Sequence, residues 1–452
     1  MKINSFLLRC TLIAALGGFL FGFETAVISG AEKTIQKLWS LSDFLLGFTV
    51  AASLIGTVIG SMIAGNPAQR YGRKKVLLVI ALMYLLSAVG CSLTPTWILF
   101  IIFRIIGGIA VGASSVVGPM YISEIAPAAV RGRLTGMFQL NIVIGILVAF
   151  LTNFAFLQLG AGSWRWMVGV MVIPAGLFAL LLRVIPESPR WLILNNRDEE
   201  ASQIFARTGE PDARAVINEE HALLSGERNN VQQALRENLF SGKFRKPILY
   251  AVLLAMFNQL SGINAILYYA PRIFEMAGFS QKASFLQPVY IGGANLLFTF
   301  LGMSIIDKVG RKTLLIIGAI GTSVFLALTA FAFNHAGGTT GSGGQYVIVY
   351  LICFIAFFAL SQGAVIWVFI SEIFPNSVRS QGSSLGSFTH WIMAAIIAWT
   401  FPVIVHGSKN GGFYSFIFFS CMMLVSLIFI WRVMPETKGR TLEQIQKDLG
   451  II

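Results

Sequence analysis

Twelve long apolar runs constrain this chain more than any other feature of its sequence. A helix needs roughly 20 mainly apolar residues to cross a bilayer, and in lipid the backbone must satisfy its own hydrogen bonds. The first runs lie near residues 8–30, 44–66, 76–93, 97–121, 133–158 and 165–185. The later ones lie near residues 246–270, 284–306, 313–334, 346–371, 382–404 and 412–434. We therefore expect an all-α membrane protein with twelve transmembrane helices.

The composition agrees with this class and excludes others. Of the 452 residues, 56% are hydrophobic and 12% charged, and the mean hydropathy is +0.76, far outside the range of soluble domains. The net charge of +13 does not indicate nucleic-acid binding, because Lys and Arg recur in short clusters between apolar runs. The four cysteines lie in or beside apolar runs without metal-ligand spacing. Neither a disulfide framework nor a metal site is expected.

The basic clusters predict the orientation of the helices. With the N-terminus inside, one side of the membrane receives Arg70, Arg73, Lys74, Lys75, Arg131, Arg133, Lys308, Arg311, Lys312 and Arg379. The loops on the other side, such as 92–96 and 337–344, carry little charge. The positive-inside rule makes the basic side cytoplasmic, so both termini are predicted to be cytoplasmic. The first run has a polar break at Glu24 and no clear cleavage site, so it is expected to be a retained span.

An internal repeat predicts the architecture. The segment 70–75 returns at 308–313, 123–127 returns at 371–375, and 186–190 returns at 435–439, with offsets of about 240–250 residues. Two six-helix halves are therefore expected, residues 1–185 and 245–452. Halves related in this way hold a substrate near the membrane midplane and expose it alternately to either side.

The polar segment 186–244 separates these halves. It combines the acidic groups 198–200 and 219–220 with the basic residues Lys243, Arg245 and Lys246 among short amphipathic stretches. This pattern favours a cytoplasmic helical linker that lies under the bilayer. We expect it to connect the halves and to carry no catalytic group.

An unusual set of polar residues interrupts the seventh run. Asn258, Gln259, Asn264, Tyr268 and Tyr269 lie within twelve residues of each other. Polar groups in hydrocarbon are costly without partners and usually face a cavity, while the glycine at 262 can loosen the helix there. The cluster predicts a pocket for a polar ligand, the alternative being amides that only tie helices together.

The motifs in these segments carry a family resemblance. Gly-Arg-Lys at 72–74, Pro-Glu-Ser-Pro-Arg-Trp at 186–191, Gln-Leu-Ser-Gly-Ile-Asn at 259–264, Ser-Glu-Ile-Phe-Pro at 371–375 and Pro-Glu-Thr-Lys-Gly at 435–439 resemble those of the sugar porters. These form a branch of the major facilitator superfamily. Nearly the whole chain is similar to the bacterial sugar-proton symporters of this branch, those for xylose among them, and more distantly to animal glucose facilitators.

The resemblance implies a sugar site. Its contacts would come from Gln139, Gln259, Asn264, Asn295, Trp367 and Trp391, with Tyr268 and Tyr269 as an aromatic lid on the outer side. Amides suit hydroxyls that both donate and accept, and aromatic faces cover the C–H surface of a sugar. Taken alone, the two tryptophans would be read as packing or interface residues.

The chain departs from the family pattern at three positions. Asn258 stands where the family usually has Gln, His390 stands where it has an amide, and no proline occurs near Ala364. A histidine at 390 could bond a sugar hydroxyl, titrate near neutral pH, or simply pack in a helix. The identity of the sugar and the flexibility of the gate therefore stay open.

Glu24 is a carboxylate two-thirds along the first span, and Arg104 on the fourth span is the matching intramembrane cation. The resemblance assigns this pair to proton coupling, because the symporters of the family have an acid here and the facilitators a neutral residue. The alternative is a buried ion pair that never titrates.

The charged repeats predict a cytoplasmic gate. The residues that would form it are Arg73, Glu124, Arg131, Glu187, Arg311, Glu372, Arg379 and Glu436. They could bridge the halves when the inner side is closed and separate when it opens. Gln69 stands where many relatives have Asp, whereas the second copy keeps that acid, so the gate contacts of the two copies would be unequal. Alternatively, these charges only reflect the orientation of the helices in the membrane and form no gate.

Together with these patterns, the resemblance implies a secondary transporter that moves a monosaccharide by alternating access with proton symport, in a bacterial inner membrane and as a monomer. An uncoupled sugar facilitator is the main alternative, and a nontransporting sensor or a channel is a weaker one. An enzyme is not expected, because the four histidines are scattered and form no catalytic constellation. The expected partners are a sugar, a proton and membrane lipid, with no cofactor.

Overall fold

The computed structural model describes residues 3–127, 129–210, 213–218, 221–222, 239–336, 343–375, 377–440, 442–449 and 451. Within these ranges the regular secondary structure is helical, and twelve spans are long and apolar enough to cross a membrane. The predicted all-α fold and the number of spans are therefore confirmed. The chain is a multi-pass membrane protein.

Most spans are single helices: α1 (Ser5–Leu38), α2 (Asp43–Ile63), α4 (Arg73–Leu93), α5 (Trp97–Ile125), α6 (Arg131–Phe156), α15 (Gln281–Val309), α16 (Arg311–Ala336), α19 (Arg379–His406) and α20 (Gly411–Arg432). The others are interrupted, and their parts are α7 (Ser163–Gly169) with α8 (Val172–Leu181), α12 (Arg245–Leu260) with α13 (Ile263–Tyr268), and α17 (Gly343–Leu360) with α18 (Gln362–Glu372). Shorter elements are α3 (Gly65–Tyr71), η1 (Leu157–Gly162), α9 (Pro189–Leu194), α10 (Asp198–Thr208), η2 (Gly242–Phe244), α14 (Ala270–Met276) and α21 (Leu442–Leu449).

The sequence repeat gives the same turn twice. Gly72 separates α3 from α4 at φ 97°, and Gly310 separates α15 from α16 at φ 104°. Only glycine adopts such a backbone conformation without strain. A Cβ atom at Gly72 or Gly310 would also lie against the carboxylate of Glu187 or Glu436. The glycine of each copy is thus required both by the backbone and by the acid packed on it.

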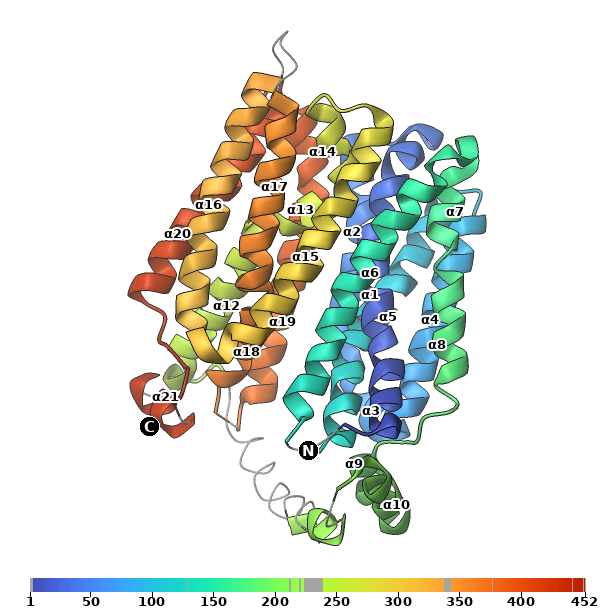
Figure 1. The fold of residues 1–452 in the computed structure, drawn as a ribbon, viewed down its shortest axis with the longest axis vertical. Coiled ribbons are helices and arrows are strands. Elements are labelled where there is room, and N and C mark those ends of the chain that lie inside the picture. Colours follow the sequence, from blue (N-terminus) through green and yellow to red (C-terminus); the bar gives the residue numbers. More distant parts are fainter. Residues whose placement is uncertain are drawn as a thin grey trace. The chain divides into compact units, whose positions relative to one another are not determined.

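The described chain forms two compact units, each with its own core. The first comprises residues up to 24, 56–146 and 168–237, and the second comprises 25–55, 147–167 and the residues from 238 onward. In the first unit α4 packs against α5 and α8. In the second, α16 lies beside α17 and α20, and α12 packs against α19 (Figure 1). The domain boundaries at residues 185 and 245 stay a prediction.

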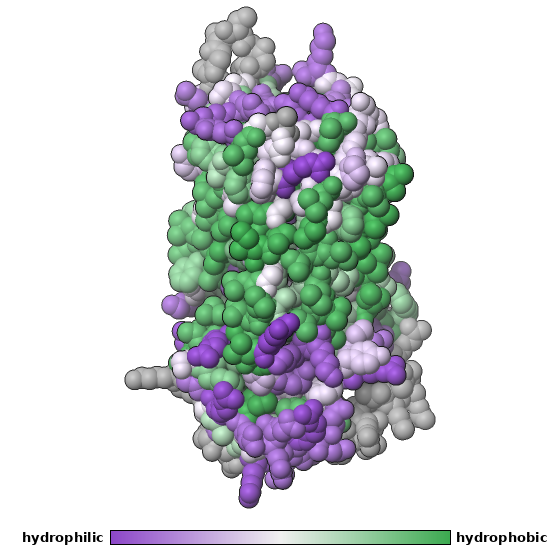
Figure 2. Space-filling view, turned by 90° about the vertical axis from the view of Figure 1, so that its right-hand side faces the viewer, coloured by the Kyte–Doolittle hydropathy of each residue, from purple (hydrophilic) through white to green (hydrophobic). Residues whose placement is uncertain are grey.

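Hydrophobic side chains gather in a broad band on the face shown in Figure 2, with hydrophilic residues gathered beyond both of its edges. Large apolar residues of α4 and α8 are exposed, among them Leu82, Leu86, Ile173 and Leu180. Water would disfavour so much exposed apolar surface, whereas lipid tails do not. The surface is that of a protein surrounded by hydrocarbon.

Part of the predicted linker is described. α9 begins after Ser188, whose hydroxyl accepts the N–H of Trp191 (3.3 Å), and α10 is an amphipathic helix that buries Ala201, Ile204 and Phe205. The acidic pair 219–220 and the segment 223–238 lie outside the described residues. So does most of the glycine-rich loop predicted at 337–344.

The predicted topology can be tested with two exposed positions, Glu200 on α10 and Lys409 after α19. In a variant without the four native cysteines, Lys409→Cys should react with a membrane-impermeant maleimide on intact cells. Glu200→Cys should react only after permeabilisation, because α10 is expected inside. Labelling of both positions on intact cells would contradict the topology.

Candidate functional site

The seventh span breaks where the sequence predicts it. α12 ends at Leu260, and Gly262 has φ 79°, in the left-handed region, before α13 begins at Ile263. A Cβ atom at Gly262 would lie against the ring of Phe419. The Ser261 hydroxyl donates to the carbonyl of Asn258 (2.6 Å) and so satisfies one carbonyl at the break. The break therefore depends on a glycine for two separate reasons.

Three amides on either side of this break form a buried chain of hydrogen bonds. Asn264 Nδ2 donates to Gln259 Oε1 (2.8 Å), and Gln259 Nε2 donates to Asn258 Oδ1 (3.0 Å). Gln259 Nε2 also lies 3.1 Å from Nε2 of His390 on α19. An amide nitrogen only donates, so this ring nitrogen accepts and carries no proton. The result is a neutral cluster with donors and acceptors in alternation.

Two indole rings flank His390. Its ring centroid lies 4.8 Å from that of Trp367 on α18 and 4.8 Å from that of Trp391 on α19. The structure thus brings together six of the predicted sugar contacts: Asn258, Gln259, Asn264, Trp367, His390 and Trp391. An arrangement of amides beside aromatic faces suits a neutral, polyhydroxylated ligand.

Contact of the other predicted residues, Gln139, Asn295, Tyr268 and Tyr269, with the amide cluster stays a prediction. The Tyr269 hydroxyl donates to the carbonyl of Ala398 (2.8 Å) and its ring lies 5.3 Å from Phe401, so Tyr269 holds α19 here. Tyr268 is buried at the end of α13, and Asn295 on α15 accepts from Thr299 Oγ1 (3.4 Å). Gln139 is half-buried on α6 in the first unit. Its place in a common site with Gln259 stays a prediction.

The predicted coupling residues form an ion pair within the first unit. Arg104 Nη1 on α5 donates to Glu24 Oε1 on α1, and both residues are buried, at 2% and 4% exposure. A Cβ atom at Gly107 would lie 3.2 Å from that oxygen, so the glycine keeps the space beside the carboxylate open. Among the described residues, Nε and Nη2 of Arg104 have no hydrogen-bond partner. The guanidinium therefore retains donors beyond its bond to Glu24.

The predicted gate residues pair within each unit. Arg73 Nη2 donates to Glu124 Oε1 (2.8 Å), and in the second copy Arg311 Nη2 donates to Glu372 Oε1 (3.1 Å). A hydroxyl supports each acid: Ser188 donates to Glu124, and Thr437 donates to Glu372 Oε2 (2.6 Å). Bridging of the halves by these residues stays a prediction.

The other gate residues act on helix ends. Glu187 accepts the backbone N–H groups of residues 73 and 74 (2.8 and 3.0 Å), and Glu436 those of residues 311 and 312 (both 3.0 Å). Carboxylates at helix N-termini satisfy free N–H groups and favour the helix dipole. Arg131 Nε donates to the carbonyl of Ala126 (3.4 Å), and Arg379 Nε to that of Phe374 (3.3 Å). These charges thus also stabilise the turns of the repeat.

A second ion network, buried at Arg272 and Glu32 and exposed at His406, was not predicted from the sequence. It joins Glu32 and Gln36 of α1, Asp43 of α2, Arg272 of α14 and His406 of α19, all in the second unit. Glu32 lies just beyond the first apolar run, eight residues after Glu24, and an acid at this place was the signal that could have indicated Glu32, though not its partner. Among the described residues, no group of three or more His, Cys, Asp or Glu side chains could hold a metal ion.

Comparisons with known proteins identify relatives that match almost the whole chain. Residues 10–449 match the family described as Sugar (and other) transporter. The chain is 36% identical over 450 residues to the arabinose-proton symporter of Bacillus subtilis, covering 98% of this chain and 95% of that protein. It is 35% identical over 483 residues to the D-xylose-proton symporter of Escherichia coli (strain K12), covering 98% and 96%.

A solved structure agrees with these relatives. The chain is similar to the xylose transporter XylE from E. coli in a partially occluded inward open conformation, with 34% identity and a TM-score of 0.84. The match covers 97% of this chain and 100% of that one. The chain therefore has the fold of this transporter and of the superfamily to which it belongs.

Gly262→Ala tests the role of the break. A left-handed alanine costs about 1–3 kcal/mol and would also contact Phe419, so the variant should unfold in detergent at a lower temperature than the wild type. Gly293→Ala is the matched control, because a Cβ atom there would meet nothing within 4 Å in helix α15. Equal melting temperatures for the two variants would show that the break does not require glycine.

Proposed function

The chain belongs to the sugar transporter family of the major facilitator superfamily, and from this premise we propose that it moves a monosaccharide across the cell membrane with a proton. It is a secondary transporter and not an enzyme. The sugar would be a pentose or a hexose, since relatives matched over almost their whole length are named as arabinose and D-xylose symporters. Alternating access between two six-helix halves would carry it across.

The buried pair of Glu24 and Arg104 is the observation that carries the proton part of the proposal. A carboxylate in a membrane span must either keep a cationic partner or take up a proton. When Glu24 is ionised, Arg104 stabilises it; when Glu24 is protonated, the attraction between the two side chains is lost. The pair therefore has two states that differ by one proton, and proton movement can drive their exchange.

The amide cluster supports the sugar part. A sugar hydroxyl both donates and accepts, so it can replace the bonds that Gln259 makes to Asn258 and Asn264 without leaving an unsatisfied group. The indoles of Trp367 and Trp391 offer apolar faces beside it. We propose that the site is completed by His390, Gln139, Asn295, Tyr268 and Tyr269.

The setting of the protein follows from the same relatives. Those compared are bacterial, so we place the chain in a bacterial inner membrane with both termini cytoplasmic, its exposed apolar band in contact with lipid, and acting as a monomer. The Arg73 and Arg311 clusters would lie at the cytoplasmic end and act as the inner gate. Pairs that form within one half would exchange partners when that gate moves.

Substitutions in the amide cluster should weaken sugar binding. Gln259→Ala removes a donor and an acceptor, and Trp367→Ala removes an aromatic face, each costing about 1–3 kcal/mol, or roughly fivefold to a hundredfold in Kd. Calorimetry with purified protein and a panel of pentoses and hexoses measures this. Trp166→Ala, which removes a 63% exposed indole on α7, is the matched control and should bind normally. Wild-type affinity in both site variants would place the sugar elsewhere.

Glu24→Gln tests proton coupling, because glutamine mimics the protonated carboxylate. In proteoliposomes the variant should lose sugar accumulation driven by an inward proton gradient but keep exchange of sugar across equal concentrations. Wild-type vesicles treated with a protonophore should behave like the variant. If Glu24→Gln accumulates sugar normally, coupling resides in another group; if the wild type never accumulates it, the chain is an uncoupled facilitator.

A further inference from the structure

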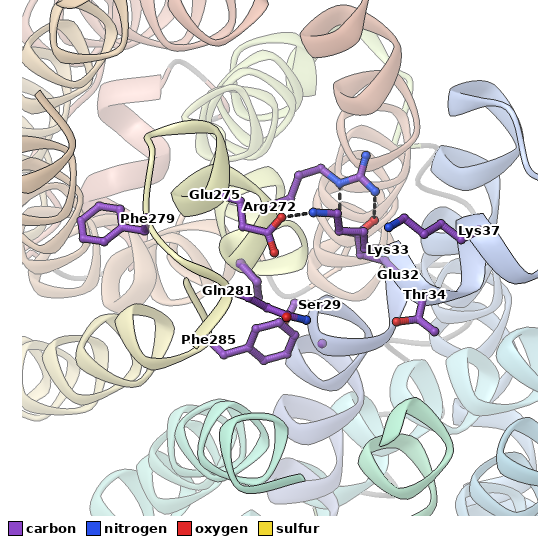
Figure 3. A pocket seen from close by; sticks show the side chains of 12 residues that line it. Ser29, Glu32, Lys33, Thr34, Lys37, Arg272, Glu275, Phe279, Gln281 and Phe285 are labelled. Carbon is purple, nitrogen blue, oxygen red and sulfur yellow. Dashed lines mark hydrogen bonds and ion pairs between the residues drawn. The ribbon is translucent and has the colours of Figure 1, made fainter. Parts of the chain in front are cut away.

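An arginine on α14 binds an acid on α1 with two parallel hydrogen bonds (Figure 3). Arg272 Nε donates to Glu32 Oε1 (2.9 Å), and Nη2 donates to Glu32 Oε2 (2.6 Å). Nη2 also donates to Oε1 of Gln36, one turn along α1 (2.7 Å). Both charged side chains are buried, at 7% and 1% exposure. Bidentate pairs of this kind are strong and fix geometry, so α1 and α14 are held in one register.

A histidine extends this pair to two further helices. Arg272 Nη1 lies 3.3 Å from Nε2 of His406, the last residue of α19. Nδ1 of His406 lies 2.8 Å from Oδ1 of Asp43 at the start of α2, which also accepts from Gln36 Nε2 (2.9 Å). A closed network thus joins α1, α2, α14 and α19.

The partners of His406 determine its protonation state in this arrangement. A guanidinium has only donors, so Nε2 must accept from Arg272 and carries no proton. A carboxylate only accepts, so Nδ1 carries the proton and donates to Asp43. His406 is therefore neutral here. A proton added to Nε2 would place its N–H against the N–H of Arg272 Nη1. It would also place a positively charged imidazolium beside the guanidinium.

The charged groups around this histidine come from the three other helices of the network. α1 contributes Glu32, Lys33 and Lys37, α2 contributes Asp43, and α14 contributes Arg272 and Glu275. Lys33 and Glu275 form a further ion pair beside the network. These residues, Asp43 excepted, line a hollow of about 430 Å³ that is open to solvent. The side chain of His406 is 36% exposed, so a proton can reach it.

Two of these helices, α2 and α19, approach closely next to the network. A Cβ atom at Gly47 of α2 would lie against the carbonyl of Trp399 on α19, and the Trp399 indole donates to the carbonyl of Phe44 (3.1 Å). α19 begins at Arg379 and spans 28 residues, about 42 Å, before His406. The network therefore lies at the end of α19 far from the basic residue at its start, where α1 and α2 of the predicted first half would meet α14 and α19 of the predicted second half.

We propose that this network is a proton-responsive latch that closes the outer end of the transport path. Protonation of His406 Nε2 repels the Arg272 guanidinium, keeps the bond to Asp43 and removes the contact of α14 with α19, so that only the bonds of Arg272 to Glu32 and Gln36 of α1 still hold α14. External acid then favours opening of the outer end, the state in which sugar and proton are loaded. The proposal rests on the proposed function, since opening matters only if the halves alternate.

Distances between spin labels test the latch directly. Labels on Lys37→Cys of α1 and Met276→Cys of α14, in a protein without native cysteines, report separation of the outer ends. Glu24→Gln is included so that titration of the coupling carboxylate cannot contribute. Without sugar, the population with the longer distance should rise about fivefold or more between about pH 8 and about pH 5, because acid supplies the proton that displaces Arg272 from His406.

Two substitutions at histidine separate the latch from other titrations. His406→Gln should keep the short distance at both pH values, because glutamine can accept from Arg272 and donate to Asp43 without binding a proton. His221→Gln, at an exposed pair with Asp198, is the control and should respond to pH as the parent does. A pH-independent distance in the parent, or a full pH response in His406→Gln, would overturn the proposal.

Glu32→Gln provides an independent arm. It should populate the longer distance even at about pH 8, because Arg272 loses its anionic partner. A short distance at that pH would contradict a latch held by this pair. Proton-driven sugar accumulation is measured separately on the wild type. If accumulation fails while the distance still depends on pH, symport is rejected. If accumulation occurs while the distance does not depend on pH, the latch is rejected.

Discussion

An ionised side chain within a bilayer must have a partner of opposite charge or change its protonation, and this constraint governs the polar chemistry of the whole chain. Glu24 has Arg104, Glu32 has Arg272, and Arg73 has Glu124. A buried ion pair adds little net stability because desolvation offsets the attraction, but loss of one partner is costly. Such pairs therefore determine which helices stay together, and a change in the protonation of one partner changes which helices are held to each other.

The two proposed ligands require different sites. A sugar is neutral, so amides and indoles around Gln259 and His390 can bind it without any charge. A proton requires a group that can hold it, and Glu24 is a carboxylate that Arg104 attracts only in its ionised state. The two groups belong to different compact units, so coupling between them requires a movement that both sites influence. Alternating access provides that movement.

Local patterns in the sequence predicted much of this structure. Run length predicts the spans because the bilayer fixes the length of a helix, and the glycine at 262 predicts the break because only glycine adopts that backbone conformation readily. The repeat predicts that Arg73 and Arg311 have equivalent surroundings, and Glu124 and Glu372 occupy the same place beside them.

Contacts between distant residues outside the repeated and family motifs were the part that sequence patterns could not supply. Glu32 and Arg272 are 240 residues apart, and neither belongs to a repeated motif, so nothing in the sequence indicates their pairing. The same holds for His406, which reads as the end of an apolar run until Asp43 and Arg272 are seen on its two nitrogens. The bond of Tyr269 to the carbonyl of Ala398 is likewise visible only in the structure, and its predicted role in a lid stays a prediction.

Proton movement during sugar uptake tests the central claim most directly. Lightly buffered vesicles that contain the wild-type protein are given a concentrated sugar from the panel outside, and the external pH is recorded with a glass electrode. Symport predicts that the external medium becomes more alkaline when the transported sugar is added and stays unchanged when a sugar that does not bind is added. Entry of labelled sugar at the same rate with no change in external pH would contradict the account.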